Sequence, residues 1–248
     1  MTRFFVFLLL LTLTSFVTKA QAPIHMAAKE GKLEAVQKLL KSKPSLVNLK
    51  DDRGLTPLHH AAAGNIDVVR FLVKKGAKIN AQSKNGSTPL YVAARFGKTD
   101  IAKYLLENKA NINATGEAGS AMHQAVYRAP KELVELFLSY HPDLTLTEST
   151  GQTVMHVAAT WNNYEIYPLL IAAGGNINQK DLKGNTPLHC TLEFFDSKST
   201  AYSKVAEILI QNKALLNERN NNGLTPLGLA RQKGAKDMIK LLEEAGGI

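Results

Sequence analysis

The sequence predicts an all-α solenoid, a linear stack of short helix pairs in which each pair is supported by its neighbours. Three observations predict this fold class. A four-residue phrase recurs down the 248-residue chain, its copies lie about 33 residues apart, and a single cysteine excludes an intramolecular disulfide framework or a thiolate metal cluster. With 45% hydrophobic and 21% charged residues, the chain can bury a sizeable core, and wholesale disorder is excluded.

The recurring phrase is Thr-Pro-Leu-His or a variant of it. The copies begin, in chain order, at Ala22, Thr56, Thr88, Ser120, Thr153, Thr186 and Thr225. These starts are separated by 34, 32, 32, 33, 33 and 39 residues, which divides the chain after residue 20 into seven units. Such a period is typical of repeat architectures, in which one supersecondary unit is used again and again.

The second unit shows why each copy of the phrase predicts a helix pair. Thr56 can cap a helix, and Pro57 suits the first helical position, where its missing N–H is not needed. Gly64 ends this helix, and apolar residues at helical spacing over 68–73 predict a second helix that stops at Gly76. Helices of about two turns are not stable alone in water, so stacking between units must stabilise them.

Most units also close alike, with an apolar residue followed by Asn. The closing residues are Asn48, Asn80, Asn113, Asn178 and Asn217. Through the phrase, the period and this closing Asn, the chain from about residue 22 to 248 resembles the ankyrin repeat family. The resemblance implies seven helix-turn-helix units with projecting β-hairpin loops, and a structural role for the phrase histidines in bracing cap and hairpin. It also implies a non-enzymatic protein-binding module with a concave groove.

Residues 1–20 predict a secretory signal peptide. Arg3 supplies a positive start, an apolar run follows over 4–17, and small residues lie at Ala20 and Ala22. The run is shorter than the roughly 20 residues that a helix needs to cross a bilayer, so an uncleaved anchor is the weaker alternative. We expect cleavage after Ala20, with Ala22 as the second possibility.

Export bears on the partners expected of the mature domain, residues 21–248. Its formal charge falls from +9 to +7 because Arg3 and Lys19 leave with the leader, and this balance favours acidic partners. A protein outside the cytosol seldom meets chromosomal DNA, so we expect no nucleic acid partner. No later window is long and apolar enough to cross a membrane. We expect a secreted or periplasmic monomer that binds a protein, with an acidic surface as the best fit.

The resemblance places the partner on the ends of the first helices and on the hairpin tips. Aromatic and Arg side chains are enriched among interface hot spots. The predicted partner-binding residues are Arg95, Phe96, Tyr127, Arg128, Thr160, Trp161, Phe194, Phe195, Lys84 and Lys183. Further basic residues near the tips are Lys50, Arg53, Lys180 and Arg219. Acidic residues that reduce the positive charge of the tips are Asp51, Asp52, Glu117, Glu148 and Asp181. The alternative for Phe96, Tyr127 and Trp161 is packing between units.

Several units depart from the pattern. The fourth lacks the Thr and Pro of the phrase and gains Pro130, which we expect to open its second helix; this unit is the predicted weak point. In the fifth, Pro168 should kink the second helix unless that helix starts late. In the sixth, residues 193–203 replace the short link between the two helices. This segment is an inert insertion, a lengthening of the helices or an element that contacts the partner. The charged residues of the first and last units predict polar caps.

No catalytic motif is present. Five of the seven histidines stand at the fourth position of the phrase, and no His-Glu-x-x-His, paired cysteine or Gly-x-Ser-x-Gly pattern occurs. We therefore expect no enzyme activity, metal or cofactor. Cys190 is predicted to be a small core residue, with an intermolecular disulfide as the alternative. Two other functions stay open: adhesion to a polyanion or anionic envelope surface, and action as a secreted effector inside another cell.

Overall fold

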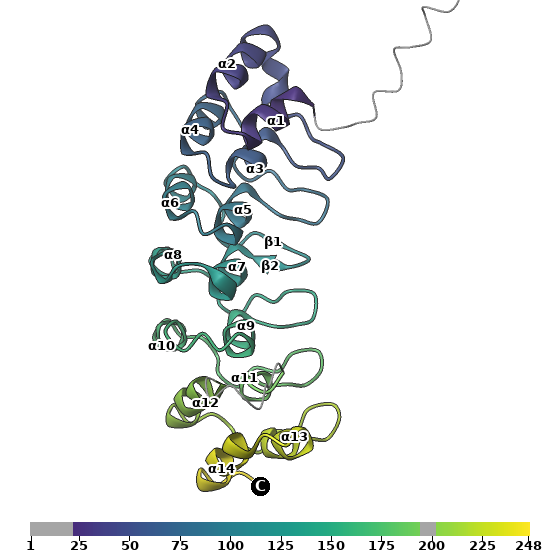
Figure 1. Cartoon of the computed structure of the whole chain (residues 1–248), viewed down its shortest axis with the longest axis vertical. Coiled ribbons are helices and arrows are strands. Elements are labelled where there is room, and N and C mark those ends of the chain that lie inside the picture. Colours follow the sequence, from purple (N-terminus) through teal and green to yellow (C-terminus); the bar gives the residue numbers. More distant parts are fainter. Residues whose placement is uncertain (1–21, 194–201) are drawn as a thin grey trace, which may run out of the picture.

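The computed structural model of the protein describes residues 22–193 and 202–248. In this part of the chain fourteen α-helices follow one another as pairs and form two rows, with loops projecting beyond the row of first helices (Figure 1). The first helices are α1 (Pro23–Lys29), α3 (Pro57–Ala61), α5 (Pro89–Arg95), α7 (Ala121–Arg128), α9 (Val154–Thr160), α11 (Pro187–Cys190) and α13 (Pro226–Lys233). The second helices are α2 (Leu33–Ser42), α4 (Ile66–Lys74), α6 (Thr99–Glu107), α8 (Lys131–Leu138), α10 (Tyr167–Ala172), α12 (Tyr202–Gln211) and α14 (Lys236–Glu244). The predicted helical solenoid is confirmed.

Helices α3, α7, α9 and α11 begin at the recurring phrase because its first residue caps them. In each, the Thr or Ser hydroxyl accepts a hydrogen bond from the backbone N–H of the third helical residue. The side chain of the phrase His in turn accepts the backbone N–H of the capping residue. In α5 the Thr88 hydroxyl accepts the backbone N–H of Tyr91 at 3.2 Å. Ser120 completes the same cap for α7, so the fourth unit keeps its helix start without Thr or Pro.

The loops that join one unit to the next end in tight turns, here called the tips. The tips lie at 51–55, 83–87, 115–120, 148–152, 181–185 and 220–224. In all but the third, the backbone N–H of the first residue donates to the carbonyl of the fifth at 2.9 to 3.0 Å. Within the described residues only the third tip pairs as strands, β1 (Thr115–Gly116) with β2 (Gly119–Ser120). The predicted projecting loops are present, and in the described part of the chain most of them close through a single turn rather than through paired strands.

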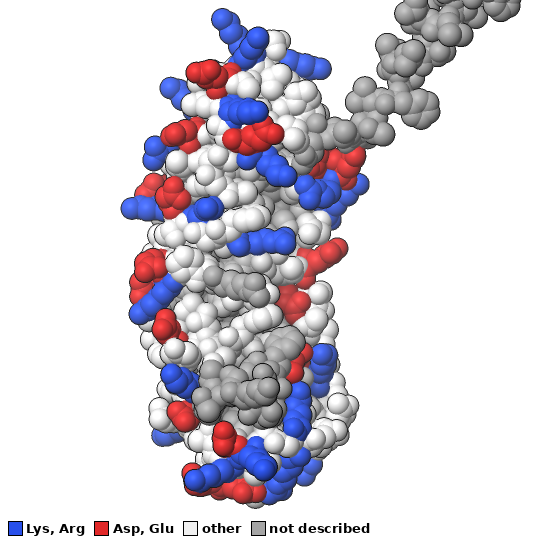
Figure 2. All heavy atoms as spheres, viewed as in Figure 1, with Lys and Arg blue, Asp and Glu red and all other residues white. Residues whose placement is uncertain are grey.

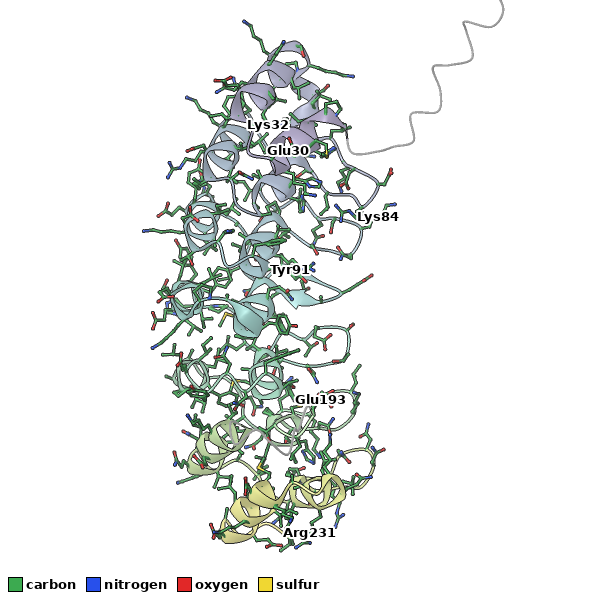
Figure 3. The ribbon with its side chains drawn as sticks, viewed as in Figure 1. Glu30, Lys32, Lys84, Tyr91, Glu193 and Arg231 are labelled. Atoms are coloured by element: carbon green, nitrogen blue, oxygen red, sulfur yellow. The ribbon has the colours of Figure 1, made fainter. Side chains whose placement is uncertain are left out.

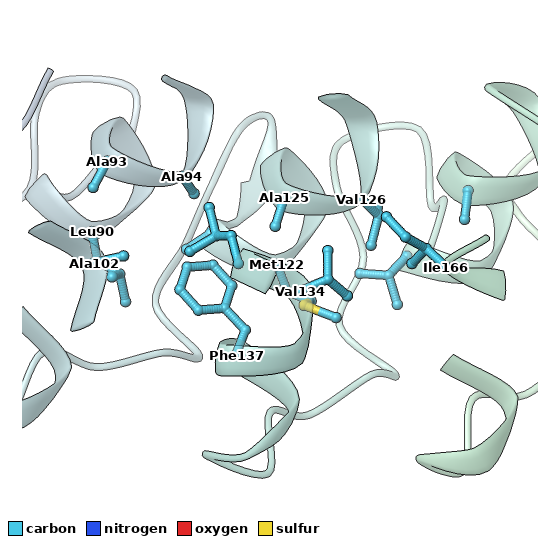
Figure 4. Close-up of a cluster of buried hydrophobic side chains, with 14 of the residues drawn as sticks. Leu90, Ala93, Ala94, Ala102, Met122, Ala125, Val126, Val134, Phe137 and Ile166 are labelled. Carbon is cyan, nitrogen blue, oxygen red and sulfur yellow. The ribbon is translucent and has the colours of Figure 1, made fainter. Parts of the chain in front are cut away.

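The core runs along the whole stack. Each first helix contacts the first helices of the adjoining units, and fully buried alanines such as Ala61 and Ala93 let these helices approach closely. Figure 4 shows Phe137 of α8 among side chains from α5 and α7, including Leu90 and Met122. Apolar side chains thus fill the space between units as well as the space within each helix pair, as expected for helices too short to stand alone.

In the units that have a closing Asn, its side chain bonds the backbone of the next unit. The Asn48 side chain accepts the backbone N–H of Lys78 at 2.8 Å and donates to the carbonyl of Gly76 at 3.1 Å. Asn80 does the same one unit later, to the backbone of Asn111 and Lys109. Among the residues described, Asn113, Asn178 and Asn217 each accept a backbone N–H of the following unit.

The two proline departures have different outcomes. Pro130 precedes the first residue of α8, so it opens the second helix of the fourth unit as predicted. Helix α10 begins only at Tyr167, which places Pro168 in the first turn, where no backbone N–H is required. The predicted kink is absent because the helix starts late. Second helices contact one another along the stack, most sparsely at α8 and α10.

The sixth unit and the leader are described only in part. Helix α11 ends at Cys190 after four residues, so this first helix is not lengthened. The remainder of the insertion, 194–201, and residues 1–21 lie outside the described residues. Within the part that is described, no helix combines the length and the apolarity needed to cross a membrane.

Candidate binding groove

The phrase histidines bridge neighbouring units. His59 Nδ1 accepts the backbone N–H of Thr56 at 3.1 Å, which assigns the proton to Nε2, and Nε2 donates to the carbonyl of Ser87 in the next tip at 3.0 Å. His123, His156 and His189 make the same pair of bonds. Their predicted structural role is confirmed, and both ring nitrogens are occupied by backbone.

Burial keeps these rings neutral. It lowers the pKa of His59 from 6.5 to about 4, against the opposing effect of the Ser87 carbonyl. Burial also lowers the pKa of His123, His156 and His189. Among the described residues, no group of three or more His, Cys, Asp or Glu side chains could hold a metal ion. These four histidines therefore supply framework, because both nitrogens of each ring are bonded.

Two histidines at the N-terminal end differ from this pattern. His60, outside the phrase, bonds Asp51 through Nε2 at 3.0 Å, and burial lowers its pKa despite that carboxylate. His25 has no hydroxyl cap because Ala22 precedes its helix, and its Nε2 bonds the carbonyl of Leu49 at 2.8 Å. The rings of His25 and His60 lie 5.3 Å apart.

Several acidic tip residues hold their own turns. One carboxylate oxygen of Asp51 accepts the backbone N–H groups of Arg53 and Leu55, and Asp181 does the same for Lys183 and Asn185. Asp181 is only 7% exposed. These carboxylates were predicted to moderate the positive charge of the tips toward a partner. The structure corrects this for Asp51 and Asp181, because one oxygen of each bonds the turn backbone and both carboxylates are largely buried.

A pocket of about 590 Å³, here called the N-terminal pocket, lies between the tips and the first helices of the second and third units. Its wall on the tip side includes Arg53 and Lys84, and its wall on the helix side includes Tyr91, Arg95 and Phe96. Figure 3 shows this placement, with Lys84 at a tip and Tyr91 on α5. The full lining is Lys29, Asp52, Arg53, Leu55, His59, His60, Ala63, Ser83, Lys84, Asn85, Ser87, Tyr91, Val92, Arg95 and Phe96.

A second pocket of about 620 Å³, the central pocket, adjoins the first on the C-terminal side. It is lined by Tyr91, Arg95, Ala118, His123, Gln124, Tyr127, Glu148 and Val157. Tyr91 and Arg95 line both pockets, so the two hollows form one groove with lining residues from the first five units. Burial raises the pKa of the Tyr91 hydroxyl, and the charge of Arg95 acts in the opposite direction. This hydroxyl is therefore a neutral hydrogen-bonding group at the centre of the groove.

The structure brings four of the predicted partner-binding residues to this groove: Lys84, Arg95, Phe96 and Tyr127. Phe96 is 54% exposed, so the alternative that it packs between units does not describe it. Trp161 is 40% exposed and meets the Tyr127 ring edge-on at a centroid distance of 4.4 Å. Tyr127 belongs to the fourth unit and Trp161 to the fifth, so this contact fits the alternative of packing between units, although Tyr127 also lines the central pocket.

The other predicted residues do not join them. Thr160 is only 5% exposed, so its assignment to the partner surface is wrong: the side chain points into the core near Cys190. Lys183 lies on the fifth tip, with its Nζ 3.9 Å from the Glu193 carboxylate. Phe194, Phe195 and the side chain of Arg128 fall outside the described part of the chain.

Sequence reasoning missed Tyr91 as a site residue, although a signal was present. Tyr91 takes the fourth position of the phrase, where His stands in most other units, so this unit gives up the His bridge and places a phenol in the groove. Gln124 and Asn85 were missed for a different reason, because nothing in their local sequence distinguishes them. Only the stacking of units brings them to one surface.

Cys190 is a core residue. Its side chain is 1% exposed, and burial raises the pKa of its thiol. A buried, protonated thiol is a poor nucleophile. The predicted core role thus fits the structure, and a disulfide to another chain would require the sixth unit to open.

Charge is segregated along the tips. Basic residues lie on the first and second tips, as Arg53 and Lys84, and again at the fifth and sixth tips, as Lys183 and Arg219. Glu117 and Glu148 lie on the two tips between them. Figure 2 shows this order at the tip edge, with blue groups toward both ends and red groups in the middle. No ion pair with a described carboxylate involves Lys29, Lys84 or Arg95.

The fold and this groove define a repeat protein of the ankyrin class. A family model described as ankyrin repeats matches residues 8–83, 24–116 and 122–198, and the chain belongs to the ankyrin repeat family. The ankyrin repeat domain of human ASB11 has a similar structure, with a TM-score of 0.76 and 26% identity over 90% of this chain and 98% of that one.

The chain is also similar to proteins of several different kinds. The chain is 28% identical to the probable 26S proteasome regulatory subunit p28 of Saccharomyces cerevisiae, over 91% of this chain and 85% of that protein. It is also 28% identical to human inversin and to human transient receptor potential cation channel subfamily A member 1, over 88% and 90% of this chain. It spans about a fifth of the length of these two proteins, 21% and 18%. Ankyrin repeats are generally protein interaction modules, and nothing in these findings indicates catalysis.

Proposed function

We propose that this protein is an exported, non-enzymatic binding module of seven ankyrin repeats that holds a protein partner in the groove between its tips and its first helices. The observation that carries the proposal is the junction of the two pockets at Tyr91 and Arg95, which makes one continuous concave site from residues of the first five units. Exposed Phe96 beside Arg95 supplies the kind of anchor found at interface hot spots. A preformed surface of this kind binds without the cost of ordering itself.

The groove is tested by affinity capture with matched variants. We expect a partner retained by the wild-type protein to be lost with the Arg95→Ala/Phe96→Ala double variant, because each hot-spot side chain contributes roughly 2 kcal/mol, or about 30-fold in affinity. The control is Lys103→Ala, an exposed cation of α6 on the row of second helices. Equal capture by all three proteins would show that the partner binds elsewhere.

Export is proposed from the apolar leader, residues 1–20, and places the mature chain in the periplasm or the medium. Mass spectrometry of the protein recovered outside the cytosol should find Gln21 or Pro23 as its first residue. An intact Met1 in that fraction would overturn the cleavage. The same sample run on a sizing column tests the expected monomer.

A second candidate is adhesion to a polyanion or an anionic envelope surface, favoured by the net charge and by the basic tips. The salt dependence of binding distinguishes the two functions. Binding that depends on many phosphate or carboxylate contacts weakens steeply between low and high salt, whereas a groove with an aromatic anchor weakens less. The third candidate, an effector that acts inside another cell, is tested by localising a tagged protein.

A further inference from the structure

We infer that the N-terminal pocket recognises an acidic peptide segment that carries an apolar side chain among its carboxylates. The inference rests on the proposed protein-binding function and narrows it to one class of ligand at one end of the groove. It follows from the charges around the pocket, the chemistry of its helix side and the contrast with the adjoining central pocket.

The charge of the pocket is positive and largely uncompensated. Its lining holds four cations and one carboxylate, that of Asp52. Three of the cations, Lys29, Lys84 and Arg95, form no ion pair with any carboxylate that the structure describes. The fourth, Arg53, lies 3.8 Å from Asp51, a weak contact because that carboxylate also bonds His60 and the turn backbone. Unpaired cations around a hollow attract and orient carboxylates.

The histidines in the lining do not change this balance near neutral pH. Burial lowers the pKa of His59 to about 4 and lowers that of His60 as well. Both rings are already bonded, His59 to Ser87 and His60 to Asp51. The positive potential of the pocket therefore comes from the Lys and Arg side chains, and it should persist from mildly acidic to basic conditions.

The apolar side of the pocket distinguishes a peptide from a simple polyanion. Leu55, Ala63, Val92 and Phe96 contribute to the lining, and Phe96 is 54% exposed. A hollow of about 590 Å³ has the size of sites that take small ligands or a few side chains. A polyphosphate or a uniformly acidic polymer would leave this apolar surface uncovered, whereas an apolar side chain of a peptide would remove it from water.

The central pocket explains why the acidic part of the ligand belongs at the N-terminal end. Its only charged lining residues are Arg95 and Glu148, and Glu148 is held by Thr150. A ligand that crosses both pockets would thus place its carboxylates near Lys84 and uncharged residues near Tyr127. Arg95, which lines both pockets, marks the change from one environment to the other.

The test uses fluorescence anisotropy of three labelled peptides with the purified protein at moderate salt. The first is acetyl-Asp-Glu-Glu-Phe-Glu-Asp, the second replaces Phe by Ser, and the third replaces every acidic residue by Lys. We expect the first to bind at least tenfold more tightly than either of the others. Inorganic polyphosphate should compete weakly, and equal binding of polyphosphate or of the Ser peptide would overturn the inference in favour of a polyanion site.

Charge-reversal variants locate the site. We expect Lys84→Glu and Arg95→Glu each to weaken the Phe peptide at least tenfold, whereas the matched reversal Lys103→Glu on α6 leaves it unchanged. Circular dichroism and the melting temperature confirm that each variant is folded. Binding that all three reversals reduce equally would place the peptide outside the pocket and overturn the inference.

The outcome separates this inference from the function on which it rests. If the natural partner still depends on Arg95 and Phe96 but no acidic peptide binds, the ligand class is wrong and the binding function stands. If neither the partner nor the peptides respond to these variants, both proposals fail.

Discussion

A histidine of the recurring phrase performs two tasks with two nitrogens. Nδ1 of His59 completes the helix cap of its own unit, while Nε2 donates to the Ser87 carbonyl in the next tip. The first bond is local, so the spacing of Thr and His along the chain predicts it. The second bond exists only when the units are stacked, and it makes the cap depend on the neighbouring unit.

The buried histidines make the stability of the protein depend on pH. The pKa of His59 is about 4 in the folded state and 6.5 in the reference state, so its contribution is complete above about pH 6.5 and is lost as the pH falls toward 4. For His59 alone this loss amounts to about 3 kcal/mol by pH 4. His123, His156 and His189 shift in the same direction. We expect the melting temperature to fall steadily between pH 6.5 and 4.

The variant His59→Ala isolates this effect. At pH 7.5 it should lower the free energy of unfolding by about 1 to 3 kcal/mol, because the cap and the bridge are lost. The difference from wild type should shrink toward zero as the pH approaches 4, since the wild-type histidine then favours unfolding too. Denaturant titrations at four pH values measure the difference in unfolding free energy between the two proteins. A difference that does not vary with pH would contradict the lowered pKa of His59.

At the scale of elements, the tips are joined to one another by backbone as well as by side chains. The backbone N–H of Lys84 donates to the carbonyl of Arg53 at 2.9 Å, and that of Glu117 donates to Asn85 at 3.0 Å. These bonds require close approach of two backbones. They position the tip wall of the N-terminal pocket, which therefore depends on the spacing between units.

Two glycines with the same backbone conformation give a matched test of this approach. Gly86 has φ +80° and its missing Cβ would lie 2.5 Å from the Cα of Gly116 in the next tip, whereas Gly76 has φ +85° and open space around it. We expect Gly76→Ala to cost about 1 kcal/mol, the strain of a left-handed alanine. Gly86→Ala should cost roughly 1 to 3 kcal/mol more, because the tips must separate. Chemical denaturation compares the two, and equal costs would show that the tips are not in tight contact.

At the scale of the whole molecule, the row of second helices has one sparse junction among the described residues. Neighbouring second helices contact each other along the chain, but α8 and α10 do so least, because α10 starts late at Tyr167 and is only six residues long. The stability of a repeat stack is approximately a sum of unit and nearest-neighbour terms, so a weak interface opens first. The fourth unit is the predicted weak point, and the sparse second-helix contact lies at its boundary with the fifth, where the first helices α7 and α9 still pack together.

Hydrogen exchange tests this junction. Backbone amides of α8 and α10 should exchange at least tenfold faster than those of α4 and α6, which belong to interior units with closer second-helix contacts. Mass spectrometry of peptic fragments resolves these helices. Equal protection in all four helices would show that the stack opens as one cooperative unit or only from its ends.

The sequence by itself determined the unit and its chemistry. The period, the Thr or Ser caps, the phrase histidines and the core alanines predict the helix pairs and their stacking, because these signals act within a unit and repeat in every one. Most positions of the groove also follow from this frame, as for Arg95 and Phe96. Tyr91 could have been found in the same way, as the unit that lacks the phrase histidine.

The tertiary structure alone decided which side chains face the groove and which do not. Thr160 and Asp181 are polar in sequence yet point into the core and the turn, while Gln124 and Asn85 reach the groove from different units. The strand pairing of a single tip and the late start of α10 were likewise settled by contacts between units. The physical reason is that exposure and pocket shape depend on the distance and angle between stacked units, which no residue specifies on its own.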